Sequence, residues 1–322
     1  MSIFLYILTH NILPIIAIVG IGFLLGKIFT MDVKTLSKVQ FYAFVPVFTF
    51  YQIYTTDLPD NIGWVLVFVL SLMACNFLLS LILGRIRRYK RSMQAASINS
   101  LIFYNSGNIG IPVITLVFSG VPFLVDGQTP YLATALAIQV TVLVLQNFGC
   151  NVFGFYIAGA GKKMSVKEAV KSVVQMPTLY SVPLAFIFKY LIKYDLTEFP
   201  LWTSLTYLKD GLVPMALITL GVQLSHTKIS HPSLDVGISV ALRLFGGPAL
   251  AILLCSLFRF DPLTCQVLMI SSGVPTALNT ALIAAEKDNE PRFASQAVLF
   301  STILCPISLT LMVYAAQIFF PL

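Results

Sequence analysis

Residues 103–112 read Phe-Tyr-Asn-Ser-Gly-Asn-Ile-Gly-Ile-Pro and lie in the middle of an apolar stretch that covers about residues 93–119. Proline lacks a backbone donor and disfavours helix at the preceding residue, and glycine tolerates the backbone angles that a break requires. We therefore expect a broken helix rather than a continuous one. Inside a membrane, unwound backbone is tolerated only where it is buried in protein or lines a cavity. This break therefore predicts a functional site.

A second stretch, residues 271–280, reads Ser-Ser-Gly-Val-Pro-Thr-Ala-Leu-Asn-Thr and again places glycine and proline among hydroxyl and amide side chains. If the two breaks cross near the bilayer centre, the half-helices that follow present free N–H groups and partial positive charge to a common point. That arrangement suits a carboxylate. The alternative is that both stretches are proline kinks whose polar residues only pack helix against helix.

The predicted substrate-binding residues come from both stretches and are amides, hydroxyls or residues that shape the backbone. They are Asn105, Ser106, Gly107, Asn108, Gly110 and Pro112 in the first stretch and Gly273, Pro275, Thr276 and Asn279 in the second.

The composition indicates that lipid is the solvent for most of the chain. Hydrophobic residues make up 57% and charged residues 10%, and the mean hydropathy is +0.88. Segments of about 20 apolar residues can cross a bilayer only as helices, because each must satisfy its own backbone groups. Ten such stretches are found, at about residues 3–29, 36–56, 62–84, 93–119, 129–159, 169–192, 200–224, 235–258, 263–285 and 292–320. We expect an all-α polytopic membrane protein.

Prolines repeat at nearly constant spacing along the chain. Pro14 and Pro177, and Pro112 and Pro275, are each 163 residues apart, and Pro46 and Pro214 are 168 apart. This spacing predicts a five-helix unit used twice, residues 1–159 and 169–322, joined by a cytoplasmic linker at 160–168. Because five is odd, the second unit would be inverted, as in many secondary transporters. Chance coincidence is the alternative, since proline is frequent in membrane helices.

Basic residues in the first half are confined to alternate loops. They are Lys27, Lys34 and Lys38 after the first stretch, Arg85, Arg87, Arg88, Lys90 and Arg91 after the third, and Lys162, Lys163, Lys167 and Lys171 after the fifth. The positive-inside rule then predicts a multi-pass protein of the cell membrane with both termini outside the cytoplasm. The second half supports this less well, because Lys189, Lys193 and Arg259 fall on the outer side. The net charge of +7 is thus a signal of topology and does not indicate nucleic acid.

Charged residues inside the apolar stretches are few, and such residues are often functional. Asp210 is the only carboxylate expected within the membrane and is the leading candidate for proton coupling, with Lys209 beside it. Both could instead be interfacial, with Lys209 snorkelling. Arg243 could balance the charge of the substrate or bind backbone carbonyls or lipid phosphate.

The sequence contains no pattern that predicts an enzyme, a cofactor or a metal site. It has no HExxH motif, and its three histidines and five cysteines are scattered. Carriers, solute-sensing receptors and channels remain as classes. A receptor derived from a transporter usually carries a signalling domain that this chain lacks, and we therefore expect a carrier.

At four groups of residues the sequence resembles the auxin efflux carrier family, which includes plant auxin exporters and bacterial permeases for malate and malonate. These groups are Asn105 with Gly110-Ile111-Pro112, the segment from Asp210 to Gly221, Arg243-Leu244-Phe245 with Gly247-Pro248-Ala249, and Pro275. The resemblance covers essentially the whole chain.

The resemblance implies that the first, second, sixth and seventh spans form a scaffold and that the other spans form a moving domain carrying the crossed helices. It implies elevator-like transport, a homodimer, and an Asn105 that contacts the substrate. Thr276 and Asn279 depart from the plant pattern, so auxin itself is not implied. We expect a small organic carboxylate as substrate. Coupling to a proton, to sodium or to the membrane potential alone stays open.

Overall fold

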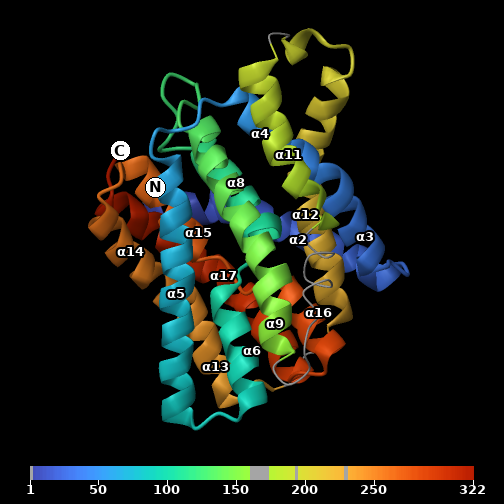
Figure 1. The fold of residues 1–322 in the computed structure, drawn as a ribbon, viewed down its shortest axis with the longest axis vertical. Coiled ribbons are helices and arrows are strands. Elements are labelled where there is room, and N and C mark those ends of the chain that lie inside the picture. The colour runs from blue at the N-terminus through green and yellow to red at the C-terminus, as the bar shows by residue number, and fades with distance from the viewer. Residues whose placement is uncertain (1–2, 160–173, 193–194, 228–230) are drawn as a thin grey trace.

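The computed structural model describes residues 3–159, 174–192, 195–227 and 231–322 (Figure 1). In these ranges the protein is helical, and the only extended pairing consists of two isolated bridges. The predicted linker 160–168, the start of the sixth predicted span, and Lys162, Lys163, Lys167, Lys171 and Lys193 lie outside the described residues.

The first half of the chain consists of helical segments in which wide π-helical turns, labelled η, alternate with α-helix. In order these are α1 (Ile3–Tyr6), η1 (Ile7–Ile12), α2 (Leu13–Ile28), α3 (Val33–Val39), η2 (Gln40–Phe44), α4 (Val45–Thr55), α5 (Ile62–Arg87), α6 (Arg91–Ile102), η3 (Ser106–Gly110), α7 (Ile111–Phe118), α8 (Leu132–Gly149), η4 (Cys150–Gly154) and α9 (Phe155–Ala158).

The second half is built in the same way. Its segments are α11 (Pro177–Phe186), η5 (Ile187–Leu191), the 3₁₀ turn η6 (Leu196–Glu198), α12 (Trp202–His226), α13 (Leu234–Ala241), η7 (Leu242–Gly246), α14 (Gly247–Phe258), α15 (Pro262–Ser272), α16 (Leu278–Lys287) and α17 (Pro291–Phe319).

Within the described residues, six continuous helical segments are long and apolar enough to cross a membrane, which makes the chain a multi-pass membrane protein. They are Phe4–Ile28, Ile62–Arg87, Leu132–Ala158, Trp202–His226, Leu234–Phe258 and Pro291–Phe319. Ser106–Phe118 and Pro262–Ser272 are apolar but shorter, because each belongs to one of the two interrupted stretches. The N and C marks appear close together on one side of the molecule, and the turn between α5 and α6 lies at its lower end (Figure 1).

Helices α2 and α12 pack closely through glycines. A Cβ on Gly22 would collide with the backbone of Ile218, and one on Gly221 would collide with the backbone of α2. Gly26 leaves similar room for Ser225. In lipid, small residues let two backbones approach and gain dispersion contacts that the apolar solvent does not supply. Gly22, Gly26 and Gly221 therefore form the closest part of the contact between these two helices.

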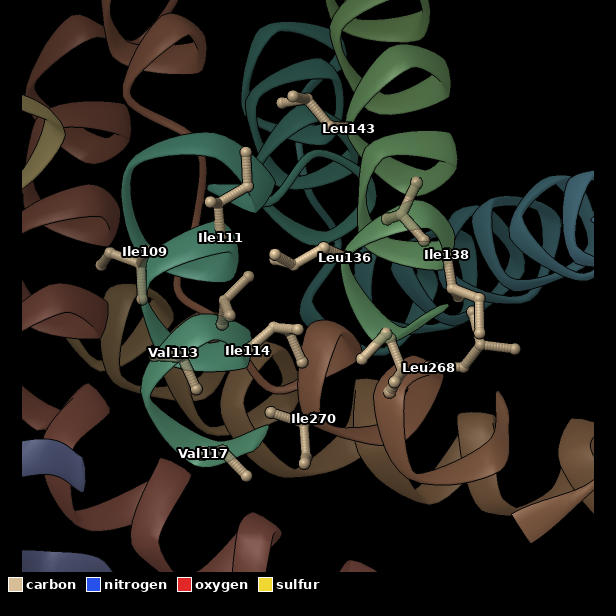
Figure 2. Close-up of a cluster of buried hydrophobic side chains, with 14 of the residues drawn as sticks. Ile109, Ile111, Val113, Ile114, Val117, Leu136, Ile138, Leu143, Leu268 and Ile270 are labelled. Atoms are coloured by element: carbon tan, nitrogen blue, oxygen red, sulfur yellow. The ribbon is translucent and has the colours of Figure 1, made fainter. Parts of the chain in front are cut away.

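Helix α7 is held in the main apolar core of the protein. Its residues Ile111, Val113 and Ile114 are fully buried and point toward side chains of α8 and α15, among them Leu136 and Ile270 (Figure 2). The second part of the first interrupted stretch is therefore packed tightly against two neighbours. Six of its eight residues are buried, so apolar packing sets its position.

Candidate functional site

The two interrupted stretches meet at their breaks. Helix α6 ends at Ile102 and η3 begins at Ser106, while α15 ends at Ser272 and α16 begins at Leu278. Between these ends, the N–H of Asn105 donates to the Pro275 oxygen at 2.8 Å and that of Ala277 donates to the Phe103 oxygen at 3.0 Å. Tyr104 and Thr276 thus form a short antiparallel bridge. Each break supplies hydrogen bonds that the other has lost by leaving the helix.

The first break lies earlier in the chain than the sequence indicated. Gly107 and Gly110 belong to the wide helical turn η3, and Pro112 is the second residue of α7, which continues directly from η3. The interruption itself comprises only residues 103–105. It ends there because the Asn105 Oδ1 accepts the Asn108 N–H at 3.1 Å and caps the new helix. Gly273 and Pro275 lie inside the second break as predicted.

Two buried glutamines hold the start of η3 from different elements. Gln40, on η2, donates from Nε2 to Asn108 Oδ1 at 2.6 Å. Gln139, on α8, donates from Nε2 to the Ser106 carbonyl at 2.8 Å. The polar residues of the first half-helix are therefore fixed by amides contributed by two other helices.

The bridge residues are held in turn by the helices that follow each break. The Tyr104 N–H donates to Gln146 Oε1 on α8 at 3.3 Å, and the Thr276 N–H donates to Ser301 Oγ on α17 at 3.2 Å. The Thr276 hydroxyl also donates to the Ser100 carbonyl at 3.0 Å. The two breaks are therefore supported in corresponding ways, by an amide in the first half and by a hydroxyl in the second.

Several buried polar atoms at the crossing have no hydrogen-bond partner among the described residues. They are Asn105 Nδ2, Gln40 Oε1 and Gln139 Oε1. Each such atom costs about 1–3 kcal/mol when left unpaired, so a cluster of them is unusual in a site without a ligand or water. It includes both donors and acceptors. The crossing is therefore equipped to bind a small polar molecule.

Asn279 lies apart from this cluster, at the wall of a large cavity. The cavity has a volume of about 1480 Å³ and lies between α3, η2, α11 and α12 on one side and α8, α16 and α17 on the other. Asn279 is in the first turn of α16, whose N-cap residue Ala277 makes no side-chain cap. The first N–H groups of this half-helix therefore have no side-chain cap, and they lie where the crossing borders the cavity.

Arg243 is fully buried beside the crossing. Its Nη1 donates to the Leu101 carbonyl at 2.5 Å, its Nη2 donates to the Ser272 carbonyl, and its Cζ lies 4.8 Å from the centre of the Tyr104 ring. Of the alternatives for this residue, the structure shows the bond to backbone carbonyls.

The structure places Lys209 and Asp210 away from the crossing. The Asp210 side chain is 61% exposed and its carboxylate pairs with the adjacent Lys209 Nζ at 2.8 Å. Lys209 also lies over the Tyr51 ring, 4.7 Å from its centre. No hydrogen bond or ion pair among the described residues connects either side chain to the two breaks.

Comparison with known proteins settles the family. The sequence matches the family described as membrane transport protein over residues 7–313. The chain belongs to this family of transporters. The resemblance to the auxin efflux carrier family is thereby confirmed. The family predicts a transporter rather than an enzyme.

The carrier is also similar to individual transporters of microorganisms. It is 26% identical to an uncharacterized transporter of Methanothermobacter thermautotrophicus over 310 residues, which cover 94% of this chain and 96% of that protein. It is 28% identical to a candidate malonate transporter of Rhizobium meliloti over 116 residues, 36% of each chain. A further transporter, from Methanocaldococcus jannaschii, is 24% identical over 157 residues, 48% of this chain and 51% of that one.

The glutamines of the carrier's site were missed by the sequence analysis. Gln40 lies in one apolar stretch, and Gln139 and Gln146 lie seven residues apart in another. Amides at such positions are equally typical of a contact between helices. A polar residue at membrane depth was the available signal, but no pattern indicated which helix it would face. Among the residues that the structure describes, no group of three or more His, Cys, Asp or Glu could hold a metal ion.

Proposed function

We propose that the protein is a secondary active transporter that moves a small organic anion, a carboxylate, through the crossing of its two interrupted helices. The observation that carries the proposal is the bridge between Tyr104 and Thr276 with three buried polar atoms beside it that have no partner among the described residues. Broken helices that meet at membrane depth are how many secondary transporters build a substrate site.

The chemistry of the crossing favours an anion. Asn105 Nδ2 is a buried donor without a partner among the described residues. The uncapped start of α16, with Asn279 in its first turn, adds backbone donors and partial positive charge. The similarity to a candidate malonate transporter is consistent with a carboxylate, and short mono- and dicarboxylates are the first substrates to test.

Contacts between the two halves support the proposed inverted repeat. Asn61, at the start of α5, donates from Nδ2 to Asp261 Oδ2 in the turn between α14 and α15 at 3.0 Å. Tyr89, in the turn between α5 and α6, donates from its hydroxyl to Asp235 Oδ1 at the start of α13 at 2.9 Å. Exchanging the halves turns one contact into the other. We infer two inverted five-helix units, residues 1–159 and 169–322.

The cavity suggests how the carrier moves. In our proposal α1–α4, α11 and α12 form a scaffold that also carries a homodimer contact, and α5–α9 and α13–α17 form the moving body. The cavity lies between these two groups and includes Lys34 and Lys38, which the charge pattern assigns to the cytoplasmic side. The structure would then be the inward-facing state of an elevator in the cell membrane, with both termini outside.

Counterflow in proteoliposomes tests the proposal. Purified protein is loaded with unlabelled malonate, malate, acetate or an amino acid, and uptake of the labelled solute is followed with and without sodium and pH gradients. We expect saturable counterflow of one or more carboxylates. Asn105→Ala should abolish it. Asn105→Ser should also fail, although serine keeps a cap for η3, because the amide donor is lost.

The proposal is wrong if Asn105→Ala transports normally and alanine at Gly273 and Pro275 is also silent. A flux that does not saturate and shows no counterflow would indicate a channel instead. The control is Gln128→Ala, because Gln128 is an exposed amide in a turn outside the crossing. Gln317 and Asn279 are unsuitable as controls, since Gln317 Nε2 is buried and Asn279 lines the cavity.

A further inference from the structure

Arg243 is a permanent cation buried in the centre of the protein. Its side chain, on η7, is 0% exposed, and none of the ion pairs between described residues includes it. A buried charge without compensation is costly. Its charge must therefore be balanced by something other than a carboxylate.

The balance comes from the ends of two half-helices. Leu101 is in the last turn of α6 and Ser272 is the last residue of α15, and Arg243 donates to the carbonyl of each. The C-terminus of a helix carries a partial charge of about −0.5, so two such ends together offer about one negative charge to the guanidinium. The face of the Tyr104 ring adds a cation–π contact.

Secondary transporters with broken helices commonly place a coupling cation against unwound carbonyls and half-helix C-terminal ends. In this chain the guanidinium occupies that position. We propose that Arg243 is the resident cation of the crossing: it takes the place of a bound sodium ion and joins the two breaks into one rigid unit. Arg243 is a positioning residue, and the inference rests on the proposed transport function.

The glycine next to this cation supports the assignment. A Cβ at Gly247 would lie 2.5 Å from Arg243 Nη2 and 3.2 Å from the Ser272 oxygen. A Cβ at the preceding Gly246 would lie 3.5 Å from its nearest neighbour, a Leu242 methyl group, which is ordinary contact. Space for the guanidinium thus depends on one of two adjacent glycines.

The first experiment asks whether the wild-type carrier needs sodium. Counterflow of the carboxylate that it transports is measured with all sodium replaced by choline. We expect a rate within about twofold of that in sodium, since a fixed guanidinium leaves no vacancy between the two helix ends. Counterflow that requires sodium would overturn the inference while leaving the proposed function intact. No counterflow with any anion in either salt would instead contradict the proposed function.

The second experiment removes the cation. Arg243→Ala should lower counterflow about 100-fold, the size of effect expected when substrate groups are misplaced by about 1 Å. Millimolar guanidinium or methylguanidinium should restore a measurable part of the activity, because the small cation can occupy the vacated position. A purely structural arginine would not give this rescue. Arg85→Ala, at an exposed position of α5, is the control and should be unaffected by guanidinium.

Alanine variants of Gly246 and Gly247 test the same inference without removing Arg243, in case Arg243→Ala does not fold. Gly247→Ala should displace the guanidinium and lower counterflow about tenfold, whereas Gly246→Ala should behave as wild type. Equal activity of the two alanine variants would overturn the inference, as would normal transport by Arg243→Ala or a rescue by choline as good as that by guanidinium.

Discussion

The two interruptions that meet at the crossing are built differently. The first has three residues, is capped by its own Asn105, and leads into a half-helix held by Gln40 and Gln139. The second has five residues and is held by hydroxyls, and its half-helix α16 begins uncapped at the cavity. The first is therefore the half that fixes geometry, and the second offers the backbone donors that an anion can use. We expect substitutions in the two halves to separate stability from transport.

Among the variants that separate stability from transport, the largest effect is expected from Asn279→Asp. A carboxylate in the first turn of α16 complements the helix dipole and should raise stability by about 0.3–1 kcal/mol. The same charge should repel an anionic substrate and lower counterflow about 100-fold, since like charges at a site disfavour one another strongly. Counterflow and thermal unfolding in detergent measure the two effects.

Asn279→Gln is the matched control for that prediction, because it keeps an amide without adding charge and should retain most of the activity. If Asn279→Asp transports as wild type, α16 does not receive the anion. If both variants lose transport and stability together, Asn279 is a structural residue of the half-helix.

The sequence predicted the positions of the two interruptions better than the contacts that hold them. Dense Gly, Pro and Asn at 103–112 and 271–280 predicted both interruptions, because these residues weaken a helix regardless of its surroundings. The first break was placed too late, since the wide turn η3 absorbs Gly107 and Gly110 within a helix. Propensity alone does not indicate that Asn105 will cap its own chain.

Contacts between distant segments were harder to predict. The contact of Gln40 with Asn108 joins residues 68 positions apart, and the choice depends on how two helices are turned about their axes. The surroundings of Asp210 were not predicted either: its side chain is 61% exposed and pairs with the adjacent Lys209. Helix rotation is set by packing against neighbours, of which the sequence pattern shows only the apolar stripe.

A smaller effect distinguishes the two glutamines of the first half-helix. In the proposed elevator, Gln40 belongs to the scaffold and Gln139 to the moving body, so only the Gln40 bond breaks during transport. Gln40→Leu removes a hydrogen bond worth about 1.4 kcal/mol that is made in only one state of the transport cycle. The rate of counterflow should therefore change about tenfold, with a modest change in the free energy of unfolding. Gln139→Leu leaves the Ser106 carbonyl unpaired in every state and should lower stability by about 1–3 kcal/mol.

Rates of counterflow and unfolding free energies for the pair decide between these roles. Should the two leucine variants give the same ratio of rate change to stability change, Gln40 and Asn108 would belong to one rigid body, and the assignment of α3 and η2 to the scaffold would be wrong.

The smallest effect is expected in the second break, from Thr276→Val. Valine has the shape of threonine but cannot donate to the Ser100 carbonyl, while the backbone bonds from Thr276 to Ser301 and from Ala277 to Phe103 are retained. Loss of one neutral hydrogen bond should lower the unfolding free energy by about 1 kcal/mol. Because the bridge to the first break is made by backbone groups, transport should fall no more than a few-fold. A loss comparable to that of Asn279→Asp would show instead that the Thr276 hydroxyl itself contacts the anion. The second half would then read the substrate through its side chains rather than through the uncapped end of α16.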